Sequence, residues 1–134
     1  MQSSNQIMDH QFDGVFFMPH VGIHHGHPDN LFRGRKVLVV GDSHYCGDCS
    51  DCGDPQQRPE CRGFTRGVIN AYLDPNHAGS WMKTFTSFIN TFFNRGTSME
   101  ERKEFLAAVS FYNFLQISAG TSPYETANYD YGDE

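Results

Sequence analysis

The strongest constraint on the fold is a group of four cysteines with the spacing C-x2-C-x2-C-x8-C between residues 46 and 61. The two-residue gaps let successive thiolates turn toward one centre, and Gly47, Gly53 and Pro55 permit the tight loop that this needs. A closed zinc site takes four thiolates and has no open position for a substrate, so we predict a structural zinc site. One alternative is an iron–sulfur cluster, which takes the same four ligands. The other is that the cysteines are plain thiols or disulfides and hold no metal. The predicted ligands are Cys46, Cys49, Cys52 and Cys61, with His44 or His77 as a substitute for one of them.

A chain of 134 residues is long enough for one domain with a modest core. We predict a single domain over residues 1–134, with residues 1–13 and 121–134 loosely ordered because they are polar or acidic. The net charge of −6 argues against a long electrostatic track for nucleic acid, although it is compatible with a small site that reads one base. No apolar run approaches the ~18 residues of a membrane span, and the first residues lack the features of a signal peptide. We therefore expect a cytoplasmic protein, in which clustered cysteines bind metal more often than they form disulfides.

Two segments have the composition of core strands. Residues 36–40, KVLVV, contain a continuous apolar run in which three of the four residues after Lys36 are β-branched valines, typical of a parallel strand that is covered on both faces. Residues 108–117, AVSFYNFLQI, are predicted to form a second core strand. Helical patterns lie between them, which indicates an α/β layered fold with a right-handed parallel crossover. Because two strands do not make an independent sheet, we expect a second copy of the chain or a missing C-terminal half to complete it.

Periodicity predicts three helices between these strands. The first covers residues 64–72 and ends before Asp74, which a proline follows. The second is expected to start at Ser80 as its N-cap, and the third has capping-box spacing at Thr97 and Glu100. An apolar stripe on the second helix is interpreted as core; its members are Trp81, Phe85, Phe88, Ile89 and Phe92.

The histidines fall into two groups. A segment rich in Gly and Pro holds His20, His24, His25 and His27, which could bind a metal, although a polar loop near the sheet edge is the interpretation that we favour. His44 differs because it lies just past the carboxyl end of the first core strand. In open α/β sheets that rim is where ligands bind.

Residues 39–45, VVGDSHY, admit two chemical interpretations. In the first, Gly-Asp-Ser begins an ester hydrolase of the GDSL/SGNH type with Ser43 as the nucleophile, activated by a distant histidine. That family also carries an Asp-x-x-His near its C-terminus, whereas here the only Asp-x-x-His after residue 45 is Asp74-Pro75-Asn76-His77, in the middle of the chain.

In the second interpretation, the segments KVLVVGDSHY and AVSFYNFLQ form one site between them. The first resembles the strand and Gly-acid loop of the uracil-DNA glycosylase superfamily, and the second resembles the strand of that superfamily that ends in a base-reading asparagine. From Val15 to Gln116 the chain is similar to an uncharacterised bacterial family of this kind, with the pattern G-[DE]-S-H-Y, then F-T-x-x-V, then F-Y-N-[FY]-x-Q.

The resemblance implies a three-layer fold with a parallel core sheet, in which catalytic and substrate-binding residues converge at the carboxyl ends of the strands. Asn113 would read the base through its amide, which offers both a donor and an acceptor. Asp42 would orient water or stabilise the developing sugar cation, and His44 would line the pocket. Phe64 would stack on a flipped base, with Tyr45 also on the substrate side.

The chain departs from the superfamily pattern after residue 116, where neither a third strand introduced by Pro-Asp nor a later histidine loop occurs. This leaves room for a truncated form, a natural short form or a relative without catalysis. The alternative function is a zinc-stabilised binding module, in which Asp42 caps a turn and Asn113 is satisfied by backbone groups. The expected partners are a nucleobase or single-stranded nucleic acid, and no membrane.

Overall fold

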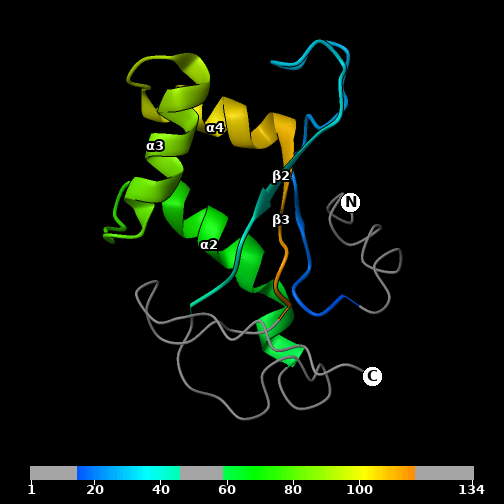
Figure 1. Ribbon diagram of the computed structural model, residues 1–134. Coiled ribbons are helices and arrows are strands. Elements are labelled where there is room, and N and C mark those ends of the chain that lie inside the picture. The colour runs from blue at the N-terminus through cyan, green and yellow to red at the C-terminus, as the bar shows by residue number, and fades with distance from the viewer. Residues whose placement is uncertain (1–14, 46–58, 117–134) are drawn as a thin grey trace.

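The computed structural model describes residues 15–45 and 59–116. The described chain folds into a small α/β unit with three strands and three α-helices (Figure 1). In chain order the elements are β1 His20–Val21, β2 Val37–Gly41, the 3-10 helix η2 Pro59–Gly63, α2 Phe64–Leu73, α3 Met82–Phe93, α4 Met99–Ala108 and β3 Val109–Asn113.

The sheet has the order β1-β3-β2, with β3 in the middle. β2 and β3 are parallel, with Val37 opposite Val109 and Gly41 opposite Asn113. This confirms the expected parallel pair and the α/β class. The sheet is nevertheless mixed, because β1 runs antiparallel to β3, so the expectation of an all-parallel sheet is wrong for the described residues.

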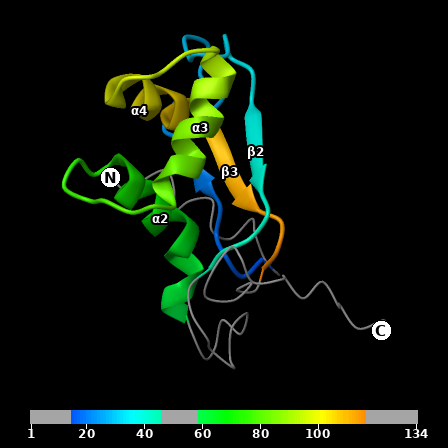
Figure 2. The ribbon, with the colours of Figure 1, turned by 60° about the vertical axis from the view of Figure 1, so that its left-hand side comes forward.

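The helices gather on one side of this sheet (Figures 1 and 2). Side chains on that side, among them Val39 and Phe111, pack against the helical core. On the other side, Leu38 and Val40 remain 59% and 56% exposed. The described residues therefore form two layers instead of the predicted three, and β2 is covered on one face instead of both. Its continuous apolar run has the composition of a doubly covered strand, but its burial alternates along the strand.

The helices begin and end close to the predicted positions, with two corrections. Ser80 is not the N-cap of α3, since the cap is Trp81 and no side chain accepts a hydrogen bond there. The capping box of α4 is one residue later than predicted, because Ser98 and Glu101 exchange the two bonds. α3 ends with Asn94 in the left-handed region at φ 54°, as asparagine tolerates well.

The core lies between the helices and the sheet. Its fully buried side chains include Ile69 and Tyr72 of α2, Ile89 of α3 and Phe105 of α4. The predicted core stripe of α3 is only partly buried. Phe88 is 46% exposed, Phe92 is 51% exposed and Trp81 is 37% exposed. In the part of the chain that the structure describes, no helix is long and apolar enough to cross a membrane.

A buried arm brings the chain into the fold before β1. Phe16, Phe17 and Met18 are each at most 5% exposed. The Met18 amide donates to the Arg62 carbonyl at 2.8 Å, which ties the arm to η2. The arm therefore closes the end of the molecule at which β2 and β3 finish.

Candidate functional site

The carboxyl ends of β2 and β3 lie side by side and extend their pairing into the following loops. Beyond the pair Gly41–Asn113, the Phe114 amide donates to the Gly41 carbonyl and the Leu115 amide donates to the Asp42 carbonyl, both at 2.9 Å. The two motifs singled out from the sequence, GDSHY and FYNF, thus leave the sheet at the same edge, as predicted for adjacent parallel strands.

Asn113 is buried at this edge with a side chain that lacks a partner among the described residues. The residue is 4% exposed. Its backbone carbonyl accepts a bond from Gln116 Nε2 at 2.7 Å, and Gln116 Oε1 accepts one from the Phe17 amide at 2.9 Å. Within the described part of the chain, no donor or acceptor pairs with the Asn113 amide group itself. Burying an amide in this way costs ~1–3 kcal/mol, so such groups are uncommon in folded proteins.

Gly41 makes room for that amide. A Cβ on Gly41 would come within 2.1 Å of Asn113 Oδ1 and 2.9 Å of Phe111 Cζ. Both distances are shorter than any real contact, so a larger residue at position 41 would have to displace the asparagine side chain. The close approach of the Asn113 side chain therefore favours glycine at this position.

A second buried asparagine shows how this fold treats a structural amide. Asn30 is 8% exposed and makes four side-chain hydrogen bonds. Its Nδ2 donates to the carbonyls of His24 and Arg35, and its Oδ1 accepts from the amides of Phe32 and Gly34. A buried amide satisfied by backbone groups was the alternative interpretation of Asn113. Among the described residues, Asn30 has such an amide and Asn113 does not.

His44 is enclosed by aromatic rings. It is 4% exposed, its Nε2 lies 2.8 Å from Thr65 Oγ1, and the rings of Phe17 and Phe64 meet it edge-on at centroid distances of 4.8 and 4.7 Å. Burial lowers the pKa of His44 to about 4, so the imidazole is neutral at pH 7. These contacts make His44 a positioning residue that joins the β2 loop to the first turn of α2.

Phe64 and Tyr45 are half-buried. Phe64 lies against His44, and its ring is tilted to that of Phe17 at 6.2 Å. It supports His44 in the structure, and stacking on a base stays a prediction. The same is true of a substrate contact by Tyr45.

Asp42 and Ser43 follow β2 directly. Asp42 is exposed, and Ser43 Oγ donates to its carboxylate at 3.4 Å. Within the described residues Ser43 has no histidine partner, and the nearby His44 ring is engaged by Thr65. Among the described residues no base lies beside Ser43, so the ester hydrolase stays a prediction.

The predicted metal site is described only at its last ligand. Cys61 lies half-buried in η2, immediately before α2. Cys46, Cys49 and Cys52 lie outside the described residues, so the four-cysteine site stays a prediction.

The histidine segment forms no metal-ligand group with other described residues. In residues 15–45 and 59–116, no three ligating side chains come together. His20 Nε2 bonds the Leu106 carbonyl at 2.9 Å, and His25 Nε2 bonds Ser110 Oγ at 3.0 Å. His77 likewise takes no part in a ligand group among the described residues, and its ring lies 6.0 Å from that of Trp81.

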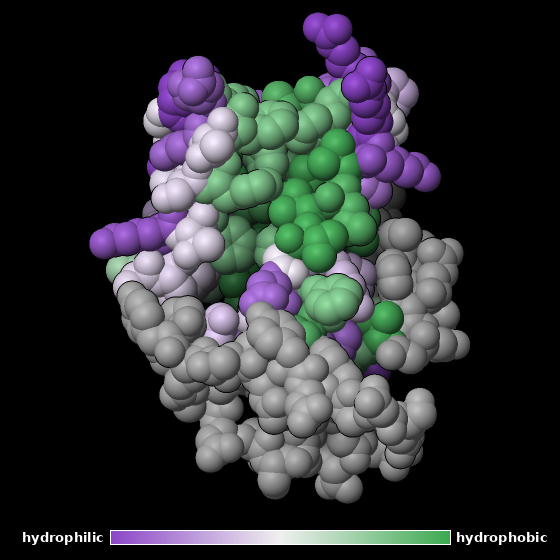
Figure 3. Space-filling view, viewed as in Figure 1, coloured by the Kyte–Doolittle hydropathy of each residue, from purple (hydrophilic) through white to green (hydrophobic). Residues whose placement is uncertain are grey.

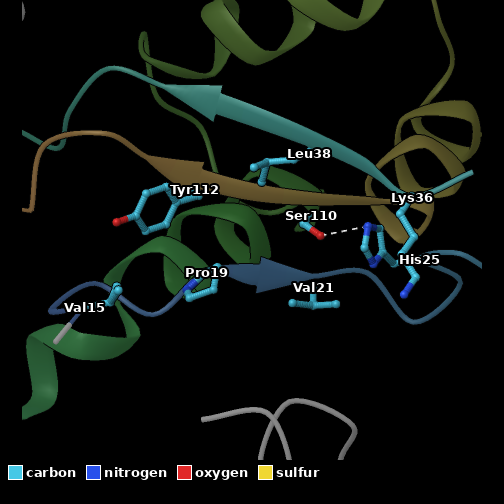
Figure 4. A pocket seen from close by; sticks show the side chains of 8 residues that line it. All are labelled: Val15, Pro19, Val21, His25, Lys36, Leu38, Ser110 and Tyr112. Atoms are coloured by element: carbon cyan, nitrogen blue, oxygen red, sulfur yellow. Dashed lines mark hydrogen bonds between the residues drawn. The ribbon is translucent and has the colours of Figure 1, made fainter. Parts of the chain in front are cut away.

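A separate groove of about 420 Å³ lies on the helix-free face of the sheet (Figure 4). Its walls are mostly apolar, and Lys36 with the His25–Ser110 pair forms one end. None of the described residues predicted for the nucleobase site lines it. The groove and the Asn113 edge are therefore different features of the sheet.

Three residues of the site had no role assigned from the sequence: Gly41, Thr65 and Gln116. Thr65 is part of the F-T-x-x-V pattern and Gln116 is part of the F-Y-N-[FY]-x-Q pattern, so the patterns could have identified both residues as part of the site. Thr65 holds His44, while Gln116 links the backbone of Asn113 to the buried arm at Phe17.

Comparison with known proteins adds no relative: no family model, no curated protein and no solved structure matches this chain.

Proposed function

We propose that the protein binds a uracil-like nucleobase through the Asn113 amide and acts as a uracil-DNA glycosylase-like protein. The observation that carries the proposal is the buried Asn113 side chain, which has no hydrogen-bond partner in the described residues. An amide presents a carbonyl acceptor beside an N–H donor, and a uracil edge presents the complementary pair. A bound base would satisfy both groups, which offsets the cost of burying them.

Asp42 is the candidate for the hydrolytic step. Its backbone is bonded to Leu115, two residues past Asn113, and its carboxylate is exposed at the same edge of the sheet. In the reaction, the bond between the base nitrogen and sugar C1′ breaks, the oxygen of a water molecule bonds to C1′, and the proton that this water gives up passes through solvent to the released base nitrogen. A carboxylate there would orient the water and stabilise positive charge on the sugar. His44 stays neutral and holds the loop that carries Asp42.

The substrate is expected to be a single-stranded end or a short oligonucleotide. A net charge of −6 opposes the many phosphate contacts of a long duplex track. An unpaired base also avoids the cost of extraction from a duplex, which is a few kcal/mol.

We further propose that Cys46, Cys49, Cys52 and Cys61 bind one zinc ion, with an iron–sulfur cluster as the alternative. The site would fix the loop between β2 and η2, which connects the GDSHY segment to α2. Elemental analysis with a visible spectrum tests this: one zinc in a colourless protein supports it, and a brown protein that contains iron selects the cluster.

The nucleobase proposal is tested with a uracil-containing single-stranded oligonucleotide, by base release and by fluorescence anisotropy. Asn113→Ala removes the reading amide, and Asn70→Ala is a matched control because Asn70 is exposed on α2. A bidentate contact is worth ~1–3 kcal/mol, so Asn113→Ala should weaken uracil-dependent binding by roughly 5- to 150-fold.

Asp42→Asn separates binding from hydrolysis. It should retain binding and lose base release, since it changes charge and keeps shape. Uracil-dependent binding without release in the wild type would support the reading role and remove the hydrolytic one. Absence of any preference for uracil over cytosine, whose edge has the opposite donor and acceptor order, or equal binding by Asn113→Ala and Asn70→Ala, would contradict the proposal.

A further inference from the structure

One side of the molecule exposes a continuous apolar surface. Figure 1 looks onto the side of β2 that faces away from β3, here called the β2 edge, with α3 beside it. In the same view, Figure 3 shows hydrophobic atoms gathered over both elements. The exposed apolar side chains are Leu38 and Val40 of β2 and Phe88 and Phe92 of α3, each between 46% and 59% exposed.

The β2 edge also presents backbone groups. Among the described residues β2 pairs only with β3, and the Gly41 carbonyl points toward β3 because it accepts from Phe114. Backbone groups of successive strand residues point to alternate edges, so those of Leu38 and Val40 point toward the β2 edge. An edge with unpaired backbone groups and apolar side chains is a template for another strand.

Charge favours a partner with the same character as the surface itself. β2 contains no charged residue and α3 contains only Lys83. A charged partner would therefore find no complement here, and two copies of the surface would not repel each other despite the net charge of −6.

We propose that two copies of the chain pair antiparallel through their β2 strands, around a two-fold axis that passes Val39 perpendicular to the sheet. This register puts Leu38 of one copy opposite Val40 of the other, twice. Their backbone groups then form hydrogen-bonded pairs, and their side chains contact across the strands. The same axis keeps both helical layers on one face of a six-stranded sheet, with α3 beside its symmetry mate, so that the exposed rings of Phe88 and Phe92 are covered as well.

The size of the surface sets the strength of the dimer. Half-exposed Phe88 and Phe92 offer roughly 200 Å² of ring area, since an aromatic side chain carries ~150–250 Å². Leu38 and Val40 add a comparable area. The apolar part is therefore about half of the ~800 Å² per partner of a standard interface, so we expect a concentration-dependent dimer with micromolar affinity.

The test measures mass by light scattering and sedimentation of the full chain over a range of ~1–200 µM, a range that brackets a micromolar dissociation constant. The wild type should rise from 15.2 kDa toward twice that mass. Val40→Lys and Leu38→Glu alone should each weaken the dimer at least tenfold, because a charge faces an apolar residue across the strands. Ile23→Lys is the matched control, since Ile23 is 74% exposed outside this surface and should not change the dimer.

The proposed register makes a sharper prediction. A mixture of the Leu38→Glu and Val40→Lys chains should form a heterodimer, because the carboxylate introduced in one chain would then face the ammonium group introduced in the other. A wild type that stays monomeric throughout the range, a dimer that both substitutions leave intact, or a mixture that fails to associate would overturn the proposal.

Discussion

The two buried asparagines of this protein show opposite solutions to the same physical problem. Asn30 organises the loop between β1 and β2 with four side-chain hydrogen bonds, so its burial costs little. Asn113 is buried at least as deeply and has no side-chain bond within the described residues. The contrast teaches that the loop uses its amide to define structure, whereas the amide at the carboxyl edge of the sheet has no such role in the described residues and is the group that we propose for ligand binding. Asn30→Ala and Asn113→Ala test this contrast directly, and an acid titration tests the packing of His44 in the neighbouring loop.

Asn30→Ala should produce the largest effect. The substitution removes four hydrogen bonds and leaves the amides of Phe32 and Gly34 without their acceptor. At ~1 kcal/mol for each bond, we expect a loss of about 3–4 kcal/mol in the free energy of unfolding, measured by urea denaturation. A loss below about 1 kcal/mol in the free energy of unfolding would show that Asn30 is not the structural amide that the comparison requires.

Acid should remove a similar amount of stability through His44. Its pKa falls from 6.5 in the unfolded chain to about 4 in the folded one, so the unfolded state binds the proton first as the pH falls. The contribution is complete above pH 6.5 and is lost progressively between pH 6.5 and about 4, with a total on the order of 3 kcal/mol. Lowering of the His20 pKa by burial acts in the same direction.

His44→Gln isolates this effect, because glutamine is uncharged throughout the titration and can still bond Thr65. The variant should show a flatter pH dependence of the urea midpoint than the wild type. Parallel curves for the two proteins would mean that the histidine is protonated without penalty, and the enclosed site described above would be wrong.

Asn113→Ala should have the smallest effect on stability. It removes no side-chain hydrogen bond within the described residues, and the loss of a few packed atoms is offset by removal of a buried amide without a partner there. We expect a change of less than about 1 kcal/mol in the free energy of unfolding. A loss as large as that of Asn30→Ala would show that Asn113 is structural.

Much of this architecture could be predicted from the sequence, since local patterns dictate it. The helix over residues 64–72 and the parallel pairing of the 36–40 segment with the 108–117 segment follow from periodicity and chain order, and the resemblance added the common edge of GDSHY and Asn113. Exposure could not be predicted in the same way. β-Branched residues suit a strand whether one face or both are covered, so the residue type of Val40 does not predict that its side chain is exposed.

The site was predictable in its location and less so in its contacts. Asn113 lies where the motif puts it, but only coordinates show that its amide has no described partner and that Gly41 leaves room for it. His44 was expected to line a pocket. Its bond to Thr65, which is 21 residues away, depends on how the first turn of α2 packs, and spacing does not encode this.

The most direct test of the central claim is the side-chain amide signal of Asn113 in ¹H–¹⁵N NMR spectra, assigned by its loss in Asn113→Ala. On titration with uracil, this signal should shift and reach saturation, while that of Asn30, whose bonds are already made within the protein, should stay in place. An Asn113 signal that uracil leaves unmoved, or one that shifts no more than the signal of Asn30, would contradict the account.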